Sequence, residues 1–415
     1  MHLKKFFAGL GPGLITGAAD DDPSGISTYS VIGATFGYAQ LWTVFLTFPL
    51  MTGVQLMCAR LALVTGEGFS GAIGQYSSRR TVWFACLLLV IANTINIGAD
   101  LAGMAEALAM VTPIPKLAWI PLITVVILLV LVFWSYKRLS RVLKWLTGVL
   151  AAYIITAFLA KPDWMAVLRS SFVPQIELNS TYLAGLVAVL GTTITPYMFF
   201  WEASQEVEEE IAQGRVTLEQ RIGATVEELR NAGRDVTAGM LWAGVTMFFI
   251  IVTTAATLHS RLIAIETAQQ AAEALRPLAG NGAYLLFTLG IVGTGLLAIP
   301  VLAGSAGYAV SEAMHWEASL DDKPLAARNF YGVIAAAIVI GAALTLLHVS
   351  AVRALYYAAI VNGVLAVPLV AIMTNLTSSR DVMGEHRNPR WLTGLGIVTV
   401  LAMGLAAVAM IVTSF

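Results

Sequence analysis

The sequence predicts an all-α integral membrane protein with about eleven transmembrane helices, of which the first and the sixth are broken. Of its 415 residues, 58% are apolar and 12% are Asp, Glu, Lys or Arg, about half the charged share of a soluble domain. The mean hydropathy of +0.79 agrees with this composition. Eleven apolar stretches reach the roughly 20 residues that a helix needs to cross the hydrocarbon core. We therefore expect a single transmembrane domain over residues 1–415, with no separate soluble domain.

The composition also excludes several classes of protein. Two cysteines, Cys58 and Cys86, are too few for a disulfide-stabilised secreted scaffold. A net charge of −1 gives no bulk attraction to nucleic acid. The five histidines are scattered, and no zinc-enzyme, nucleophile-elbow or phosphate-loop motif is present. We expect no enzymatic activity, no cofactor, no nucleic-acid partner and no obligate protein partner; the expected surroundings are the lipid bilayer.

Each expected span is an apolar run bounded by polar or charged residues. The spans cover about residues 8–33, 39–64, 81–111, 117–135, 143–160, 182–205, 237–258, 283–312, 330–348, 354–375 and 392–413. The first run is long and carries three Asp, so it does not resemble a cleavable signal peptide.

Lys and Arg predict the orientation of these spans. With the N-terminus inside, 18 of the 24 Lys and Arg fall on the inner side of the membrane and 6 on the outer side. Cytoplasmic loops are enriched in these residues. We therefore expect a multi-pass protein of the cell (inner) membrane with a cytoplasmic N-terminus and, after eleven spans, an external C-terminus.

The longest polar stretch, about residues 206–236, is expected to be a cytoplasmic loop between spans six and seven. It contains seven Glu and four Arg. The alternating charges indicate a solvated amphipathic helix. A regulatory metal site built from the acidic run is the alternative.

Span one is interrupted near its middle by G-A-A-D-D-D-P-S-G, residues 17–25. Three consecutive carboxylates, Asp20, Asp21 and Asp22, are expensive at this depth. Pro23 removes a backbone donor and disfavours helix at the residue before it. Bare backbone is tolerated in a membrane only where it lines a cavity or is buried in protein, so we expect the helix to unwind here beside water or an ion.

Span six carries a matching interruption, G-T-T-I-T-P, residues 191–196. Breaks in spans one and six indicate two repeats of five spans with opposite orientation, about 8–160 and 182–375, and one extra helix at about 392–413. Paired broken spans of this kind point to a substrate site between them.

The residue types at the two breaks suit a cation. The end of the first half-helix leaves carbonyls unpaired, which gives a partial negative charge. Asp22 adds a full negative charge, and Thr192 and Thr195 offer neutral oxygens. Hard oxygen ligands favour Mg²⁺, Ca²⁺ and Mn²⁺ over Zn²⁺ or Cu⁺.

These residues resemble the Nramp family of divalent metal transporters. Gly11-Pro12-Gly13, eight residues, then Asp22-Pro23 is similar to the family's opening, G-P-G, eight residues, D-P-G-N. Residues 98–102, G-A-D-L-A, resemble its T-D-L-A-E segment, and G-x-T-x-x-P in span six resembles G-A-T-x-M-P-H. The resemblance covers most of the chain and implies a LeuT-type fold with alternating access.

The sequence departs from the family pattern at five positions. The family Asn of D-P-G-N falls on Gly25, and the family Met, a thioether ligand, falls on Thr195. Two family histidines fall on Tyr197 and Glu202, and the Glu after T-D-L-A falls on Gly103.

The resemblance implies a ligand set for the transported ion. By position, carbonyl ligands come from Ala19 and Thr192, and Asp22 is the one side-chain ligand clearly retained. Because the soft thioether is missing, the pattern is closest to the Nramp-related, magnesium- and manganese-type branch of prokaryotes. Mg²⁺ dehydrates reluctantly, so an oxygen site that tolerates waters suits it.

Four further polar residues remain open as candidates. Asp20 and Asp21 either touch the ion or its water shell or are carboxylates that pack between helices; at 100° per residue, not all three Asp can face one cavity. Glu202 lies seven residues after Thr195 on nearly the same helix face, so it is either a second acidic station for the ion or a helix-end glutamate near the headgroups. Asn362 either faces the cavity or forms an interhelical hydrogen bond.

A proton pathway is the last site to consider. An intramembrane Asp100 is a functional candidate by default. The resemblance places it, with Glu202, on a possible proton path, but the family's neighbouring His and Glu are altered here. The alternative is a buried structural carboxylate.

The leading functional prediction is a secondary transporter that takes up Mg²⁺ or Mn²⁺. The first alternative is a sodium- or proton-coupled carrier of a small cationic or neutral organic solute on the same fold. The second is a membrane-embedded hydrolase with paired Asp22 and Asp100.

Overall fold

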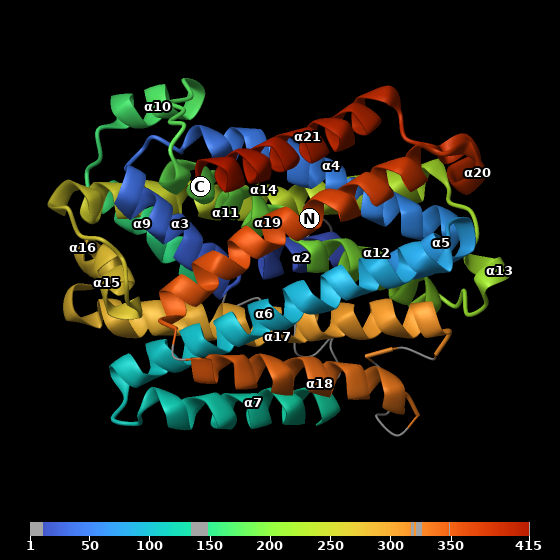
Figure 1. The fold of residues 1–415 in the computed structure, drawn as a ribbon, viewed down its shortest axis with the longest axis horizontal. Coiled ribbons are helices and arrows are strands. Elements are labelled where there is room, and N and C mark those ends of the chain that lie inside the picture. Colours follow the sequence, from blue (N-terminus) through green and yellow to red (C-terminus); the bar gives the residue numbers. More distant parts are fainter. Residues whose placement is uncertain (1–10, 134–147, 317–318, 321–325, 348, 415) are drawn as a thin grey trace, which may run out of the picture.

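The computed structural model describes residues 11–133, 148–316, 319–320, 326–347 and 349–414. Over these residues the chain is helical and contains no strand. Most of the long helices run close to the long axis of the molecule (Figure 1). The expected beginnings of spans one and five (8–10, 143–147) and ends of spans four and nine (134–135, 348) lie outside the described residues.

Spans one and six are broken, as predicted. Span one consists of α2, Pro12–Asp20, and α3, Pro23–Phe36. Span six consists of α11, Ser180–Thr193, and α12, Pro196–Ala212. Each second half begins with proline, which has no N–H to leave unpaired and whose fixed φ suits the first helical position.

The other expected spans each contain one helix within the described residues. These are α4 (Trp42–Thr65), α6 (Arg79–Val111), α7 (Lys116–Phe133), α9 (Ala151–Leu159), α14 (Val226–Thr257), α17 (Ala283–Met314), α18 (Arg328–Leu344), α19 (Ala351–Ser378) and α21 (Arg390–Thr413). Shorter helices connect them: α5 (Phe69–Tyr76), α10 (Trp164–Phe172), α13 (Leu218–Arg221), α15 (Ala268–Ala272), α16 (Arg276–Ala279) and α20 (Arg380–Met383). Single 3-10 turns cover Gly148–Leu150, His259–Arg261, Glu273–Leu275, Gly280–Gly282, Thr345–Leu347 and Gly384–His386.

Nine described helical segments are long and apolar enough to cross a membrane, or up to ten if the bent pair 148–172 forms one span. Span one is missing from this count because its halves have only 9 and 14 residues. The number of spans is therefore close to the predicted eleven without matching it.

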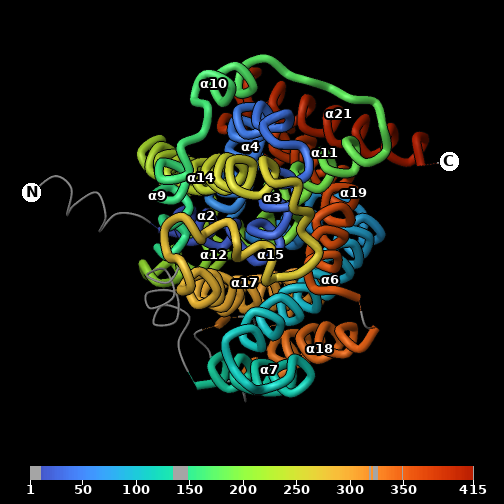
Figure 2. The backbone as a smooth tube through the Cα atoms, turned by 90° about the vertical axis from the view of Figure 1, so that its left-hand side faces the viewer, coloured from blue at the N-terminus to red at the C-terminus, as the bar shows by residue number. Residues whose placement is uncertain are grey.

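The broken helices lie in the middle of the bundle. Seen from the end, α2, α3 and α12 are surrounded by the long helices, whereas α7 and α18 form a pair at the edge (Figure 2). The most apolar window of span six is 89% buried, and those of α7 and α18 are each 28% buried. Exposed Leu117, Phe133 and Leu405 continue this apolar exterior, as a lipid-facing surface requires.

The expected polar loop 206–236 is mostly helical, which corrects its predicted boundaries. α12 continues to Ala212 and α14 begins at Val226, so only residues 213–225 connect them. Thr225 and Glu228 form a reciprocal capping box that fixes the start of α14. The fall in hydropathy after residue 205 marks the end of the apolar part of α12, and the helix itself runs further.

Glycines bring the broken spans close to their neighbours. A Cβ on Gly17 would lie 2.3 Å from the Gly239 carbonyl oxygen, so α2 and α14 pack backbone to backbone. A Cβ on Gly191 would lie 2.0 Å from the carbonyl oxygen of Ala359 in α19. Only glycine allows contacts this close. They hold α2 and α11, the two helices that lead into the breaks, against their neighbours.

Candidate functional site at the two breaks

Asp22 lies at the break of span one and is the N-cap residue of α3. Its Oδ1 accepts hydrogen bonds from the Gly25 backbone N–H and the Ser24 hydroxyl, both at 2.7 Å. Its Oδ2 accepts one from Asn96 Nδ2 at 3.2 Å. The side chain is buried. Since an ionised carboxylate offers about four acceptor positions, three donors leave capacity for one further contact.

Asn96 and Asn362 extend this site onto two other helices. Asn96 in α6 donates to Asp22, and its Oδ1 accepts from Asn362 Nδ2 of α19 at 3.2 Å. Both amides are buried. Asn362 was a candidate from the sequence, and Asn96 was not. The signal was available, because Asn96 lies one helical turn before Asp100 and shares its face of α6.

Neutral oxygens from both breaks gather around Asp22. The Ser24 and Thr192 hydroxyl oxygens are 3.4 Å apart. A Cβ on Gly25 would lie 3.5 Å from Asp22 Oδ1 and 3.5 Å from Thr192 Oγ1, so Gly25 borders the same space. The structure therefore brings Asp22, Gly25 and Thr192 together.

Tyr197 joins the two breaks through the carbonyl of Ala19. Its hydroxyl donates to the Ala19 carbonyl oxygen at 2.8 Å. Two residues earlier, the Thr195 hydroxyl is buried and has no hydrogen-bond partner among the described residues. Of these two expected ligand oxygens, that of Ala19 is engaged in this conformation and that of Thr195 is free.

Asp20 and Asp21 are buried without a hydrogen bond to any described residue. Asp21 faces Thr246 of α14, so it meets a neighbouring helix, which was one of the two alternatives. Asp20 lies near the carboxylates of Asp21 and Asp22. Buried carboxylates of this kind need a proton or a cation to offset their charge.

Asp100 lies beside the break of span one. It faces the backbone N–H of Ser24 and the Asp22 carboxylate, although its oxygens form no well-aligned hydrogen bond within the described residues. Gly103 also borders the break, since a Cβ there would meet Pro23 at 3.8 Å, with Leu355 at 3.1 Å, but it carries no side chain. Asp100 therefore neighbours the candidate ion site without the acidic companion that the resemblance implies.

Glu202 is fully buried two turns below Thr195 in α12. Its Oε2 accepts a hydrogen bond from the Thr16 hydroxyl of α2, and its Oε1 has no partner in the described part of the chain. Glu202 does not lie at the end of its helix, because α12 continues for ten residues beyond it, to Ala212. Close by, the Gly13 N–H donates to Asp235 Oδ2 at 2.7 Å. Two polar contacts thus fasten α2 to α12 and α14 on the α13 side of the breaks.

The acidic side chains of this region form no ion pair with a described basic residue. Among the described residues, no ion pair includes an Asp of the break, Asp100 or Glu202. No group of three His, Cys, Asp or Glu in the described ranges is arranged to hold a metal by itself. The site therefore combines one hydrogen-bonded carboxylate with amide, hydroxyl and carbonyl oxygens, which suits a hard cation that keeps part of its water shell.

The chain as a whole is similar to known proteins. The profile of the natural resistance-associated macrophage protein-like family, Nramp, matches residues 13–413. The divalent metal cation transporter MntH of Deinococcus radiodurans is 28% identical over 425 aligned positions, covering 97% of this chain and 89% of that protein. MntH of Erwinia tasmaniensis is 28% identical over 421 positions, with coverages of 97% and 95%.

A solved structure supports the same fold. The manganese transporter of Eremococcus coleocola, in complex with an aromatic bis-isothiourea substituted compound, matches with a TM-score of 0.76 at 19% identity. The match covers 98% of this chain and 86% of that chain. It confirms the predicted all-helical transporter fold. The relatives named here are transporters, and none is an enzyme.

Proposed function

This chain belongs to the Nramp family, and from that premise we propose that it is a secondary transporter that takes up divalent metal cations across the inner membrane. The observation that carries the proposal is Asp22, a buried carboxylate at the break of span one with amide and hydroxyl oxygens around it and no ion-pair partner among the described residues. The expected ligands are Asp22, the carbonyls of Ala19 and Thr192, and the Thr195 hydroxyl.

The proposed substrates are Mg²⁺ and Mn²⁺. The oxygens near Asp22 are hard donors, and Thr195 offers a hydroxyl where the resembling family has a thioether. Gly25 lacks a side chain, so it offers no ligand of its own beside Asp22 Oδ1 and Thr192. Mg²⁺ retains several waters in most protein sites, and Mn²⁺ accepts the same ligands.

Alternating access requires the site to open to each side in turn. We propose that the N-terminus is cytoplasmic, as the Lys and Arg distribution predicts, so α2 lies on the inner side of the site. Opening inward would then break the contacts of α2 with Glu202 and Asp235. Each polar contact is one hydrogen bond, so breaking it costs little if water enters, but moving α2 away from α14 must also separate the backbones at Gly17 and Gly239.

Proton coupling is proposed to be weak or absent. Of the two family histidines, the one on the proton path falls on Glu202 and the other on Tyr197, whose hydroxyl is engaged with the Ala19 carbonyl; the acidic companion of Asp100 is Gly103. A divalent ion gains roughly 4–5 kcal/mol from an inside-negative potential of about 100 mV, so uptake needs no proton gradient.

The test is uptake of Mn²⁺ and Mg²⁺ by proteoliposomes at fixed potential, with a pH dye inside. We expect metal uptake that follows the potential and little metal-dependent acidification. A reproducible proton-to-metal ratio would contradict weak coupling, and Asp100 and Glu202 would then be the first residues to substitute. Thermal stabilisation of the purified protein by an organic solute, with none from any divalent ion, would overturn the metal substrate itself.

A further inference from the structure

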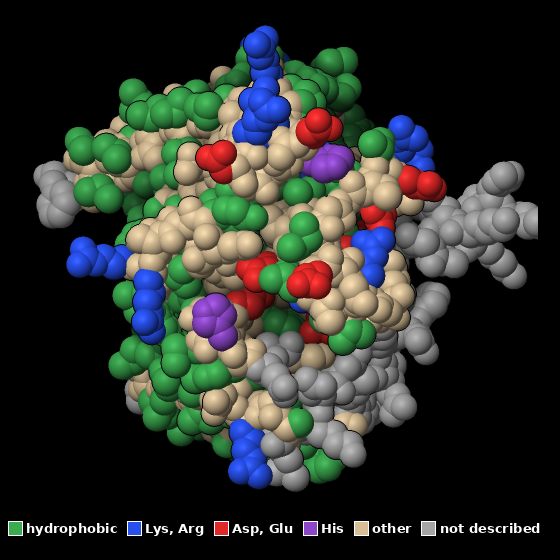
Figure 3. All heavy atoms as spheres, turned by 90° about the vertical axis from the view of Figure 1, so that its right-hand side faces the viewer, with side chains coloured by type: hydrophobic (Ala, Val, Ile, Leu, Met, Phe, Trp, Pro, Cys, Tyr) green, Lys and Arg blue, Asp and Glu red, His purple; other side chains and the backbone are tan. Residues whose placement is uncertain are grey.

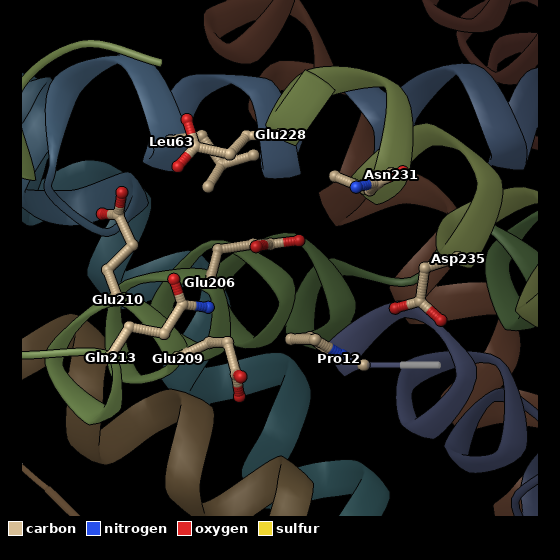
Figure 4. A pocket seen from close by; sticks show the side chains of 11 residues that line it. Pro12, Leu63, Glu206, Glu209, Glu210, Gln213, Glu228, Asn231 and Asp235 are labelled. Atoms are coloured by element: carbon tan, nitrogen blue, oxygen red, sulfur yellow. The ribbon is translucent and has the colours of Figure 1, made fainter. Parts of the chain in front are cut away.

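A pocket with five carboxylates opens at the end of the bundle that carries α13. Figure 3 shows Asp and Glu side chains around a depression on this face. The carboxylates that line the pocket are Glu206, Glu209 and Glu210 of α12, and Glu228 and Asp235 of α14. Figure 4 shows the two helices presenting these side chains to a shared space. We call this the acidic pocket.

Only part of its charge is neutralised. Arg215 forms ion pairs with Glu210, at 2.8 Å, and with Glu228. These hydrogen bonds raise the pKa of Arg215, so it stays positive. Asp235 accepts a backbone N–H from Gly13. Glu206 and Glu209 have no basic partner among the residues that the structure describes.

The burial of Glu206 is a second observation that indicates a ligand in the acidic pocket. Only 6% of the residue is exposed, it makes no hydrogen bond or ion pair within the described ranges, and its carboxylate extends into the pocket (Figure 4). The carboxylates of Glu202, Asp235 and Glu210 all lie near it. A buried, unpaired carboxylate among others is unfavourable unless a cation or proton compensates it.

The spacing along α12 connects the acidic pocket with the central site. Glu202, Glu206 and Glu210 recur every four residues, so they follow one face of the helix. Like charges at this spacing repel each other, and a cation beside them would relieve the repulsion. Glu202 lies on the same helix two turns from Thr195. The carboxylates of Glu202, Glu206 and Glu210 therefore lead from a point two turns beyond the break to the acidic pocket.

We propose that the acidic pocket is a second cation site, which holds a hydrated divalent ion between the central site and the α13 end. No three acidic groups in the described parts of the chain are placed to coordinate a metal directly, so the ion keeps its waters and the carboxylates bind through them. The inference rests on the proposed transport of divalent cations. In transport, this site takes up the ion after it leaves the breaks.

The test is Mn²⁺ binding to the purified full-length protein, followed by the loss of the free-ion electron paramagnetic resonance signal. We expect two classes of bound Mn²⁺, of which Asp22→Ala removes the first. In that background, Glu206→Gln weakens the second class by at least about tenfold, equivalent to about 1.4 kcal/mol. The matched control is Glu227→Gln, an exposed residue next to Glu228 that does not line the pocket; it leaves both classes unchanged.

Mg²⁺ should displace Mn²⁺ from the second class at similar concentrations, since both ions bind there through water. A second class that persists unchanged in both Glu206→Gln and Glu209→Gln would overturn the acidic pocket, as would its absence in the Asp22→Ala protein. If Glu206→Gln is not monodisperse by gel filtration, Glu209→Gln supplies the same comparison. Persistence of the first class in Asp22→Ala would instead overturn the central site, so the two proposals fail separately.

Discussion

The break between α2 and α3 and the break between α11 and α12 share one backbone design. Each ends in an extended residue, Asp22 (φ −69°, ψ 172°) or Thr195 (φ −96°, ψ 141°), followed by a proline that begins the second half-helix. Their side chains behave differently. Asp22 caps its own helix through the Gly25 N–H, whereas Thr195 makes no capping bond. At the first break Asp22 is a hydrogen-bonded carboxylate, whereas at the second Thr195 is neutral and its hydroxyl has no partner among the described residues.

This difference indicates a division of labour in the proposed site. The first break supplies the negative charge, already oriented by Ser24, Gly25 and Asn96. The second supplies neutral oxygens, so exchanging one of these ligands changes the ion selectivity and leaves the charge of the site the same. The comparison predicts that substitutions at the first break remove binding, and that substitutions at the second change which ion binds.

Asp22→Ala should have the largest effect. It removes the one carboxylate that is oriented at the break by three hydrogen bonds, and we expect metal affinity to fall by about 3–5 kcal/mol, more than a hundredfold. Proteoliposome uptake of Mn²⁺ measures this loss. Asp381→Ala, at an exposed aspartate of α20, is the control and should transport normally. Unchanged Mn²⁺ transport by the Asp22→Ala protein would refute the assigned site.

Asn96→Ala should have the next largest effect. The amide orients Asp22 and links it to Asn362, and partners of this kind contribute about 10–100-fold to metal affinity. Isothermal titration with Mn²⁺ measures the change.

Asn93→Ala is the matched control for this prediction. Asn93 is also buried in α6, but its amide donates to the Leu302 carbonyl and to Ser305 of α17. Both variants should lose stability, and only Asn96→Ala should lose affinity. Equal affinity losses would mean that Asn96 acts through helix packing alone.

Thr195→Met should change selectivity more than affinity. A thioether is a soft donor that favours Cd²⁺ and Mn²⁺ over hydrated Mg²⁺, by about tenfold or less, because the Gly25 position still supplies no ligand. Competition of Cd²⁺ and Mg²⁺ against Mn²⁺ binding measures the ratio. Thr195→Leu introduces a side chain of a volume similar to that of Met but without sulfur, so it should not favour Cd²⁺. If both variants change the ratio equally, the size of the side chain rather than its softness determines the selectivity.

Tyr197→Phe should have the smallest effect. It removes the hydrogen bond to Ala19 and frees that carbonyl oxygen, at a loss of about 0.5–1.5 kcal/mol in stability. Thermal unfolding without metal measures the loss, which added Mn²⁺ should partly restore. Tyr29→Phe removes a buried hydroxyl that bonds to no described residue, so it should not destabilise. A larger loss in Tyr29→Phe would show that the Ala19 contact contributes little.

The sequence predicted the chemistry of the site more fully than its geometry. Both breaks and the carboxylate of Asp22 at the first followed from proline, glycine and charge at matching positions, whereas Gly25 was included only because of the family resemblance. The Tyr197 contact with Ala19 could not be predicted, since it joins residues 178 positions apart and depends on how two half-helices face each other. The surroundings of Glu202 were ambiguous for a related reason. Hydropathy falls at residue 206, whereas the helix and its buried face continue.

The sequence by itself determined where the helices break and which charge lies there. These are local consequences: proline lacks an N–H, and carboxylates cannot remain unpaired in hydrocarbon. Only the tertiary structure decided which oxygens face Asp22 and which carboxylates line the acidic pocket. Those choices depend on the rotation of each helix about its axis and on backbone contacts such as Gly17 with Gly239, which emerge only when all the helices pack together.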